Sequence, residues 1–170
     1  MDISFTVLLN GLIFILPAYF ANTVPVYING IGRLDGGLNF FDGKPLLGAN
    51  KSIGGLISAT LAGGLLGISS FYFFHQIMGD YPIWIGFVQG FGAMVGDAVG
   101  SFIKRRFTFK PGQAFPVMDQ IGFVIFAYML VYIFHSIPIE WPLLILPATM
   151  ILHLFANSVA YKMGWKDVWW

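Results

Sequence analysis

The sequence predicts an all-α, polytopic integral membrane protein with five transmembrane helices, formed by a single domain over residues 1–170. Charged residues make up 10% of the chain and hydrophobic residues 57%, and the mean hydropathy is +0.76. An ordinary soluble domain carries about 25% charged residues, so most of this surface is expected to face a bilayer. The chain contains no cysteine, which excludes disulfides, thiolate metal sites and cysteine nucleophiles.

Five apolar segments are long enough to cross the hydrocarbon core of a bilayer, which takes about 20 residues. The expected spans cover residues 3–26, 53–78, 83–103, 119–136 and 141–161. The first segment lacks a basic start and a small-residue cleavage pattern, so we interpret it as a retained helix rather than a signal peptide. The turns between spans at 79–82 and 137–140 are short, whereas 27–52 and 104–118 form longer polar loops.

The spans differ in their polar and small residues. Asn10, Pro17 and Asn22 interrupt the first span, the second has no charge, and Asp97 lies inside the third. Small residues at four-residue spacing let membrane helices approach closely. This spacing predicts packing seams in the second and third spans, at Gly63, Gly67, Gly92, Gly96 and Gly100.

The distribution of charge predicts the orientation. All nine Lys and Arg residues fall within the two long loops and the tail after the fifth span. The opposite side carries Asp2, Asp80 and Glu140 and no cation. Lys and Arg are enriched in cytoplasmic loops, so we expect the N-terminus outside, the C-terminus inside and both long loops in the cytoplasm.

Residues 96–120 carry the strongest candidate site. At about 100° per residue, one helix face contains a carboxylate, a hydroxyl and two cations, those of Asp97, Ser101, Lys104 and Arg105. Arg106 falls on the opposite face, where we expect it to reach lipid head groups. The basic residues by themselves could form an ordinary anchor at the membrane edge. An ionisable group inside a membrane segment is costly and usually marks a pathway or a site, so Asp97 favours a site.

The first long loop suggests a second group of ligands. Lys44, Gly48, Lys51 and Ser52 suit a polyphosphate, because glycine lets backbone N–H groups approach closely and lysine supplies charge. Lys51 and Ser52 also open the second span, where free N–H groups favour an anion. Asn50 precedes Lys51, so this is not a Walker A motif. The same residue types also form ordinary connecting loops.

The two loops converge on one side of the membrane. Asn22 and Pro25, at the same end of the first span, could line a cavity there or cap the helix end. Asp97 and Asp119 bracket the second basic loop. Paired carboxylates with a set of cations are what Mg²⁺-dependent phosphoryl or nucleotidyl transfer requires, since carboxylates hold the metal and cations neutralise phosphates.

The run Ser101-Phe102-Ile103-Lys104-Arg105, followed by Lys110, resembles the Ser-x-x-Lys-Arg-x-x-x-x-Lys core of the CTP:phosphatidate cytidylyltransferase family. Asp97 occupies the carboxylate position upstream, and Asp119-Gln120 is similar to an Asp-Arg downstream. With Asp42-Gly-Lys-Pro in the first loop, the whole chain resembles the archaeal branch, CDP-archaeol synthase. Against the bacterial pattern, the chain is shorter and lacks a His-Gly-Gly element, and Pro111 and Gln120 replace an Asp and an Arg.

The resemblance implies a membrane enzyme that uses CTP, an isoprenoid ether-lipid phosphate and Mg²⁺, and it implies no nucleic-acid partner. Asp97 and Asp119 would hold the metal. Lys104, Arg105 and Lys110 would bind phosphates, and Ser101 would hydrogen-bond a phosphate or a metal-bound water. The expected substrate-binding residues are Asn22, Pro25, Lys44, Gly48, Lys51, Ser52, Pro111, Gly112 and Gln120. CTP would arrive from the cytoplasm, while the apolar tails would enter laterally from the bilayer.

Three other classes of protein remain as alternatives. A small transporter subunit predicts a polar pocket near the midplane of the membrane, whereas here the polar residues gather at one interface. A CDP-alcohol phosphotransferase requires a run of aspartates that Asp42-Gly43 does not supply. A purely structural membrane protein leaves Asp97 unexplained. The sequence leaves the oligomeric state open.

Overall fold

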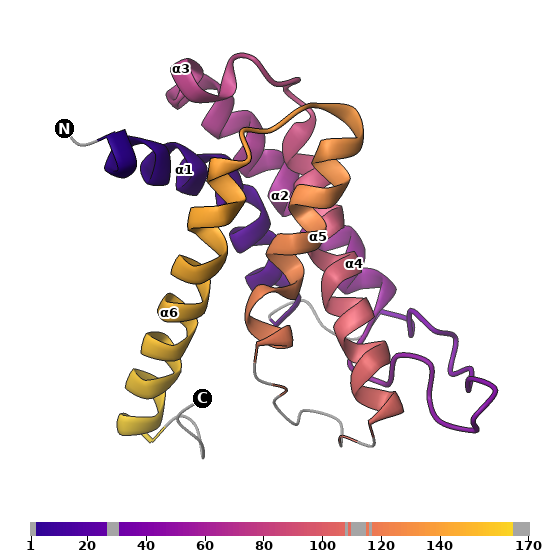
Figure 1. Cartoon of the computed structure of the whole chain (residues 1–170). Coiled ribbons are helices and arrows are strands. Elements are labelled where there is room, and N and C mark those ends of the chain that lie inside the picture. Colours follow the sequence, from indigo (N-terminus) through magenta and orange to yellow (C-terminus); the bar gives the residue numbers. More distant parts are fainter. Residues whose placement is uncertain (1–2, 27–30, 108, 110–114, 116, 165–170) are drawn as a thin grey trace.

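The computed structural model describes residues 3–26, 31–107, 109, 115 and 117–164. Within these residues the named elements are all helices: α1 (Ile3–Thr23), η1 (Val24–Val26), α2 (Ile53–Phe73), α3 (His75–Met78), α4 (Ile85–Arg106), α5 (Met118–Phe134) and α6 (Glu140–Lys162). The all-α prediction is confirmed for this part of the chain (Figure 1).

Each predicted span contains one long helix, and the departures that matter most are in the second and third spans. The second span is interrupted: α2 ends at Phe73, and Phe74 has non-helical backbone angles before the short helix α3. α4 continues past residue 103, the predicted end of the third span, so Lys104, Arg105 and Arg106 form the last turn of α4 instead of beginning a loop. Cations in the last turn interact favourably with the helix dipole, which helps this turn to persist.

In the part of the chain that the structure describes, three helical segments are long and apolar enough to cross a membrane by length and composition: Phe5–Thr23, Ile53–Phe73 and Glu140–Lys162. α5 is also apolar but has 17 residues. α4 has 22 residues, and Asp97 and the basic last turn make it less apolar than the others. Together these helices have the character of a multi-pass membrane protein.

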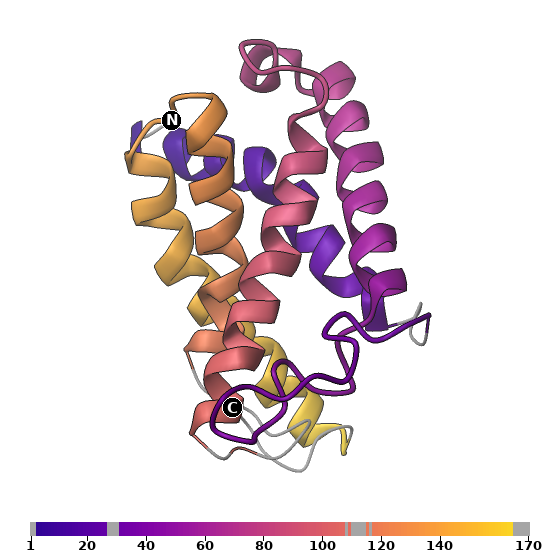
Figure 2. The same ribbon diagram turned by 90° about the vertical axis from the view of Figure 1, so that its right-hand side faces the viewer.

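α4 is the central helix of the bundle. It lies between α2 and α5, and α1 crosses obliquely against α2 and α4 (Figure 2). A core of aromatic and aliphatic side chains fills the end where α4 and α6 begin, including Phe14, Ile85, Val124 and Trp141. The Phe14 ring lies 5.0 Å from that of Trp141. This core fixes α1, α4, α5 and α6 relative to one another.

Two glycine seams bring the neighbours of α4 into backbone contact. On one side, a Cβ built on Gly67 of α2 would lie 2.6 Å from the Cα of Gly86. On the other side, a Cβ on Gly96 would lie 2.5 Å from the carbonyl oxygen of Gly122 in α5. The predicted seams are thus confirmed at these positions. Gly100 differs, because it has the Met118 side chain 3.6 Å away rather than a backbone.

α6 packs on the bundle through its first half. Trp141, Ile145 and Thr149 are buried, and the Thr149 hydroxyl hydrogen-bonds with that of Tyr19 in α1. Further on, α6 diverges from α5 (Figure 1), and its apolar side chains are exposed, among them Ile151, Leu152, Phe155 and Val159. In a chain of this composition such a surface is suited to lipid.

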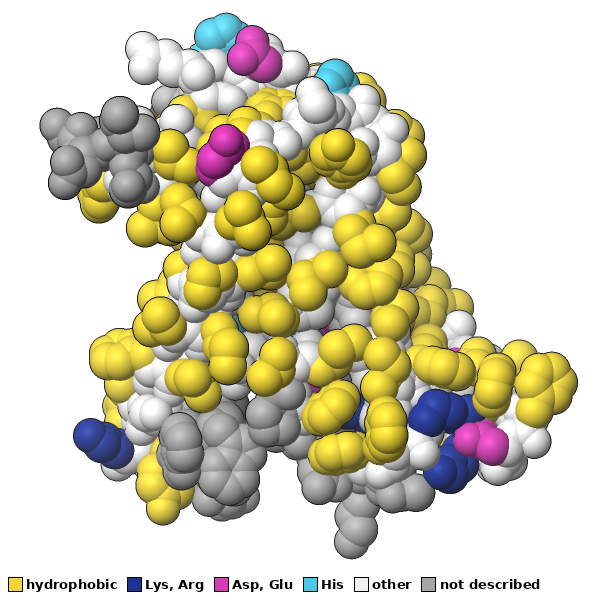
Figure 3. Space-filling view, viewed as in Figure 1, with side chains coloured by type: hydrophobic (Ala, Val, Ile, Leu, Met, Phe, Trp, Pro, Cys, Tyr) yellow, Lys and Arg dark blue, Asp and Glu magenta, His cyan; other side chains and the backbone are white. Residues whose placement is uncertain are grey.

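The charged side chains separate along the bundle. On the face seen in Figure 3, the Lys and Arg side chains lie at the end where α4 and α6 finish, with an acidic side chain beside them, whereas the other end shows acidic and His side chains. The turn before α4 contains Asp80, and α6 begins at Glu140. This separation agrees with the charge pattern of the sequence; Lys110 and Lys166 lie outside the described residues.

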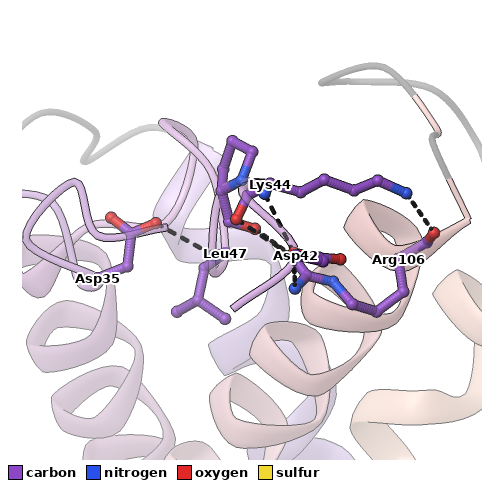
Figure 4. Close-up of polar contacts among 6 residues, drawn as sticks. Asp35, Asp42, Lys44, Leu47 and Arg106 are labelled. Atoms are coloured by element: carbon purple, nitrogen blue, oxygen red, sulfur yellow. Dashed lines mark hydrogen bonds and ion pairs between the residues drawn. The ribbon is translucent and has the colours of Figure 1, made fainter. Parts of the chain in front are cut away.

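Loop one, defined as residues 31–52, is organised around the buried carboxylate of Asp35 (Figure 4). Arg33 Nε lies 3.2 Å from it. Three backbone N–H groups donate to it over 2.9–3.1 Å, those of Gly37, Leu47 and Gly48. Burial by itself raises the pKa of Asp35, but these donors and Arg33 outweigh burial and lower the pKa to about 2. Asp35 thereby holds the two halves of the loop together.

We expect Gly96→Ala to destabilise the packing of α4 against α5. The added Cβ would meet the backbone of Gly122, and overpacking of this kind typically costs about 1–3 kcal/mol. The measurement is the midpoint of thermal unfolding in detergent. Gly122→Ala is the matched control, because its Cβ would meet the Gly96 oxygen at 3.8 Å, an ordinary contact. Equal midpoints for the two variants would contradict the asymmetry of this seam.

We expect loop one to loosen as the pH falls from about 4 to about 2. The folded pKa of Asp35, about 2, lies below its ordinary value of about 3.9. The stabilisation is therefore complete above the ordinary pKa and is lost as the pH falls through the folded one. Hydrogen-exchange protection of Leu47 and Gly48 should fall across this window. Asp35→Asn should lose that protection already at neutral pH, whereas Asp42→Asn should retain it; protection unaffected by Asp35→Asn would refute this role.

Candidate active site

Three cavities lie at the end of the bundle where α4 finishes and α2 begins. We call them the loop cavity, the central cavity and the α5 cavity, of about 120, 430 and 180 Å³. They share lining residues: Asn50 and Lys51 line the first two, Asn22 and Asp97 the last two, and Lys104 the first and third. The shared walls make them one polar region.

Asp97 lies where the central and α5 cavities meet. Its carboxylate pairs with the ammonium group of Lys51, which comes from the end of loop one. The Asp97 side chain is 35% exposed and that of Lys51 18%. The carboxylate therefore remains accessible from the cavities, while its charge is balanced by a cation from another element.

Asp119 brings a second carboxylate to the same region from the first turn of α5. Lys104 Nζ lies 2.6 Å from Asp119 Oδ2, and the backbone N–H of Phe115 donates to the same oxygen over 2.9 Å. Asp119 and Lys104 both line the α5 cavity with Asp97. Asp97 and Asp119, which bracket the second basic loop in the sequence, thus line one cavity, and each is paired with a lysine.

Ser101 and Arg105 line the loop cavity together with Gly48 of loop one. Both side chains are largely buried, with 8% and 9% of their surface exposed. Gly48 has a φ of +102°, and a Cβ there would lie 3.9 Å from Arg105 Cδ. Glycine adopts this φ without steric cost, which lets the loop turn beside the guanidinium group. A hydroxyl and a largely buried cation thus face a small cavity suited to an anion.

The end of loop one supplies three adjacent residues to the site, Asn50, Lys51 and Ser52. Ser52 caps α2, because its Oγ accepts a hydrogen bond of 3.0 Å from the N–H of Gly55, and it also lines the central cavity. Pro25 lines this cavity from η1. Asn50 lines two cavities but was not among the predicted site residues. Its position directly before Lys51 is the signal that could have identified it.

Lys44 and Arg106 do not join the cavities. Lys44 Nζ donates to the backbone carbonyl of Arg106 over 2.8 Å, and Arg106 pairs with Asp42 at 2.8 Å and donates to Pro45 O at 2.5 Å (Figure 4). Lys44 was predicted to bind substrate and Arg106 to reach head groups. In the structure these two residues fasten loop one to the end of α4, because the loop folds back over the last turn of that helix.

The remaining predicted site residues lie elsewhere. Gln120 is buried, with 4% of its surface exposed, and is not among the residues that line the three cavities. One residue after Asp119, it lies about 100° further around α5 and so faces another side of the helix. Lys110, Pro111 and Gly112 lie outside the described residues.

The donor set of the α5 cavity fits a magnesium ion. Among the described residues no group of three or more His, Asp and Glu side chains comes together. However, the carboxylates of Asp97 and Asp119 and the amide of Asn22 line one cavity. Mg²⁺ takes oxygen ligands and commonly binds through one or two carboxylates, with waters and substrate phosphates completing its coordination. Two carboxylates are therefore sufficient if a nucleotide supplies the other ligands.

Comparison with known proteins gives matches over nearly the whole chain. A family model described as CarS-like: CDP-archaeol synthase matches residues 4–170. The CDP-archaeol synthase of Methanococcus aeolicus is 40% identical to this chain over 179 residues, and the match covers 100% of each protein. That of Methanocaldococcus jannaschii is 40% identical over 177 residues, which cover 98% of this chain and 99% of the relative.

A solved structure of an intramembrane enzyme for archaeal membrane lipids biosynthesis matches with a TM-score of 0.78. The two sequences are 30% identical, and the match covers 88% of this chain and 94% of the solved one. The resemblance of the whole chain to CDP-archaeol synthase is thereby confirmed. The chain belongs to the CDP-archaeol synthase family of enzymes.

Proposed function

We propose that this enzyme transfers CMP from CTP to an unsaturated archaeal ether-lipid phosphate, giving CDP-archaeol and pyrophosphate. An oxygen of the lipid phosphate forms a bond to the α-phosphorus of CTP. The bond from that phosphorus to the oxygen bridging to the β-phosphate breaks, and pyrophosphate leaves with the electron pair. The observation that carries this proposal is the meeting of loop one with α4 through the Lys51–Asp97 ion pair, which surrounds one polar region with carboxylates and cations.

The proposed nucleophile needs no general base. A phosphomonoester has a second pKa of about 6, so the lipid phosphate is largely dianionic at neutral pH. The protein then has to align two anionic substrates and neutralise their charge. The cavities suit this task, because the described residues that line them include lysines, an arginine and amides but no histidine.

We assign Lys51, Lys104 and Arg105 to the phosphates of CTP and the departing pyrophosphate. Both lysines lie beside a carboxylate and line two cavities each, so their ammonium groups can turn toward a bound phosphate. Ser101 would donate a hydrogen bond to a phosphate oxygen from the wall of the loop cavity. Other walls would come from Asn22, Pro25, Gly48 and Ser52. Lys110 keeps its expected phosphate-binding role, and Pro111 and Gly112 their expected substrate-binding role, as predictions.

Asp97 and Asp119 would hold Mg²⁺ in the α5 cavity, with Asn22 as a neighbouring oxygen donor. When bound, the ion would act as a Lewis acid that neutralises charge on the phosphate oxygens of the nucleotide. The chain's own contribution is to keep two carboxylates on one wall. A lysine next to each carboxylate balances its charge until substrate enters.

For the membrane topology we infer five spans, with the N-terminus outside and the active site facing the cytoplasm. The described cations gather at the end of the bundle that holds the cavities, and positively charged loops favour the cytoplasmic side. This side also has access to CTP. A transporter would instead need its polar pocket near the membrane midplane, whereas these cavities lie beside loop one and the last turns of α4.

We expect Asp97→Asn to lower turnover by at least about a hundredfold, because it removes an anionic ligand from a preorganised charged site. The assay measures Mg²⁺-dependent transfer of label from the α-phosphate of CTP into a lipid fraction, with an equal amount of pyrophosphate. Asp42→Asn is the matched control, since Asp42 pairs with Arg106 outside the cavities, and it should remain active. Full activity of Asp97→Asn would refute the metal role, and no transfer by the wild type would refute the function.

We expect Lys51→Ala to raise the KM for CTP by about tenfold or more, the effect of losing one charge-assisted hydrogen bond of about 1.5–3 kcal/mol. Lys44→Ala, from the same loop, should change this KM little, because its ammonium group binds the Arg106 carbonyl rather than facing a cavity. Steady-state kinetics with both substrates would separate the two variants. Equal effects of the two substitutions would contradict the assignment of Lys51 to the nucleotide.

A further inference from the structure

The outer part of loop one exposes apolar side chains in an otherwise polar segment. Phe41 is 100% exposed, Leu38 65% and Phe40 37%. Residues 38–40 run antiparallel to 44–46, with hydrogen bonds from Phe40 N to Lys44 O (2.8 Å) and from Leu46 N to Leu38 O (3.0 Å). Exposed apolar clusters of this kind mark contact with a membrane or a partner.

These aromatic rings continue the surface of α4. The ring of Phe41 lies 5.1 Å from that of Phe40, which lies 5.2 Å from the ring of Phe102 in α4. Phe102 follows the exposed Phe91 by eleven positions, so at about 100° per residue the two project to nearly the same side of α4. The series Phe102, Phe40 and Phe41 therefore extends the apolar outer side of α4 beyond the bundle.

Charged groups lie beside this series at the end of α4. The Arg106 guanidinium group lies 4.9 Å from the ring centre of Phe40 and 4.7 Å from that of Phe102, and it pairs with Asp42. Figure 3 shows the apolar surface of this segment, at the lower right, next to the yellow band of the bundle, with dark blue and magenta side chains beneath it. Aromatic rings and basic groups in this order are typical of a membrane–water interface.

We propose that Leu38, Phe40 and Phe41 form an interfacial anchor, which inserts between the lipid head groups beside α4 at the active-site end of the bundle. A lipid surface fits better than a second copy of the chain, because the anchor continues the lipid-facing side of a membrane helix and keeps its charges on the aqueous side. The anchor holds loop one at the level of the membrane surface. Loop one in turn carries Asn50 and Lys51 into the cavities.

The absence of cysteine from the sequence permits a direct test. Phe41→Cys and Leu38→Cys, each labelled with an environment-sensitive fluorophore, are reconstituted into liposomes. Asn39→Cys is the matched control for Leu38→Cys, because neighbouring residues of the extended segment 38–40 project to opposite sides. Phe41 lies in the turn that follows, with its ring against that of Phe40. Lipids that carry a nitroxide near the head group should quench the probes at 38 and 41 several-fold more strongly than the probe at 39. A water-soluble quencher should give the reverse order.

Two results would overturn the proposal that these side chains form an interfacial anchor. One is equal quenching of the three probes by the nitroxide lipids, which would mean that the loop stays in water. The other is a lipid-independent signal at 41 that disappears as the protein is diluted in the bilayer, which would mean contact with a second copy. Phe41 lies outside the proposed catalytic groups, so CTP transfer by each labelled variant reports its folding. The depth measurement needs no substrate, and it remains informative if transfer fails.

Discussion

The charge of Asp97 in α4, the central helix of an apolar bundle, is the constraint on which the rest of this site depends. An ionised carboxylate in a low-dielectric environment is costly unless a cation or a metal compensates it. Lys51 provides the compensation from a position 46 residues earlier in the chain. That pair requires loop one to fold back toward α4, and this return encloses the loop and central cavities. The same pairing principle recurs between Lys104 and Asp119.

The glycine seams explain how α4 can hold both pairs at once. Close backbone contact with α2 on one side and with α5 on the other brings the start of each of these helices to the last turns of α4. Lys51 and Ser52 directly precede α2, and Asp119 lies in the first turn of α5, so both helix starts place polar residues beside α4. Larger side chains at the seams would separate the helices and widen the distance between the carboxylates.

The charged side chains of loop one fall into two groups, those that hold the loop in place and one that faces the cavities. Asp35 binds its own backbone, while Lys44 and Asp42 fasten the loop to the last turn of α4 through Arg106. Lys51 at the end of the loop is left to face the cavities. Two lysines of one loop thus have different surroundings, and residue type alone does not predict which lysine faces the cavities.

The sequence by itself determined the helical class, the approximate helix positions and the polar face of α4, because all three follow from local hydrophobicity and helical periodicity. It did not reveal the break at Phe74, where neither Gly nor Pro signals an interruption. Only the tertiary structure decided which cation meets which carboxylate, that Asn50 joins the cavities, and that Lys44 and Gln120 do not. These outcomes depend on how distant segments pack, and no local pattern encodes the partner of a charge many residues away.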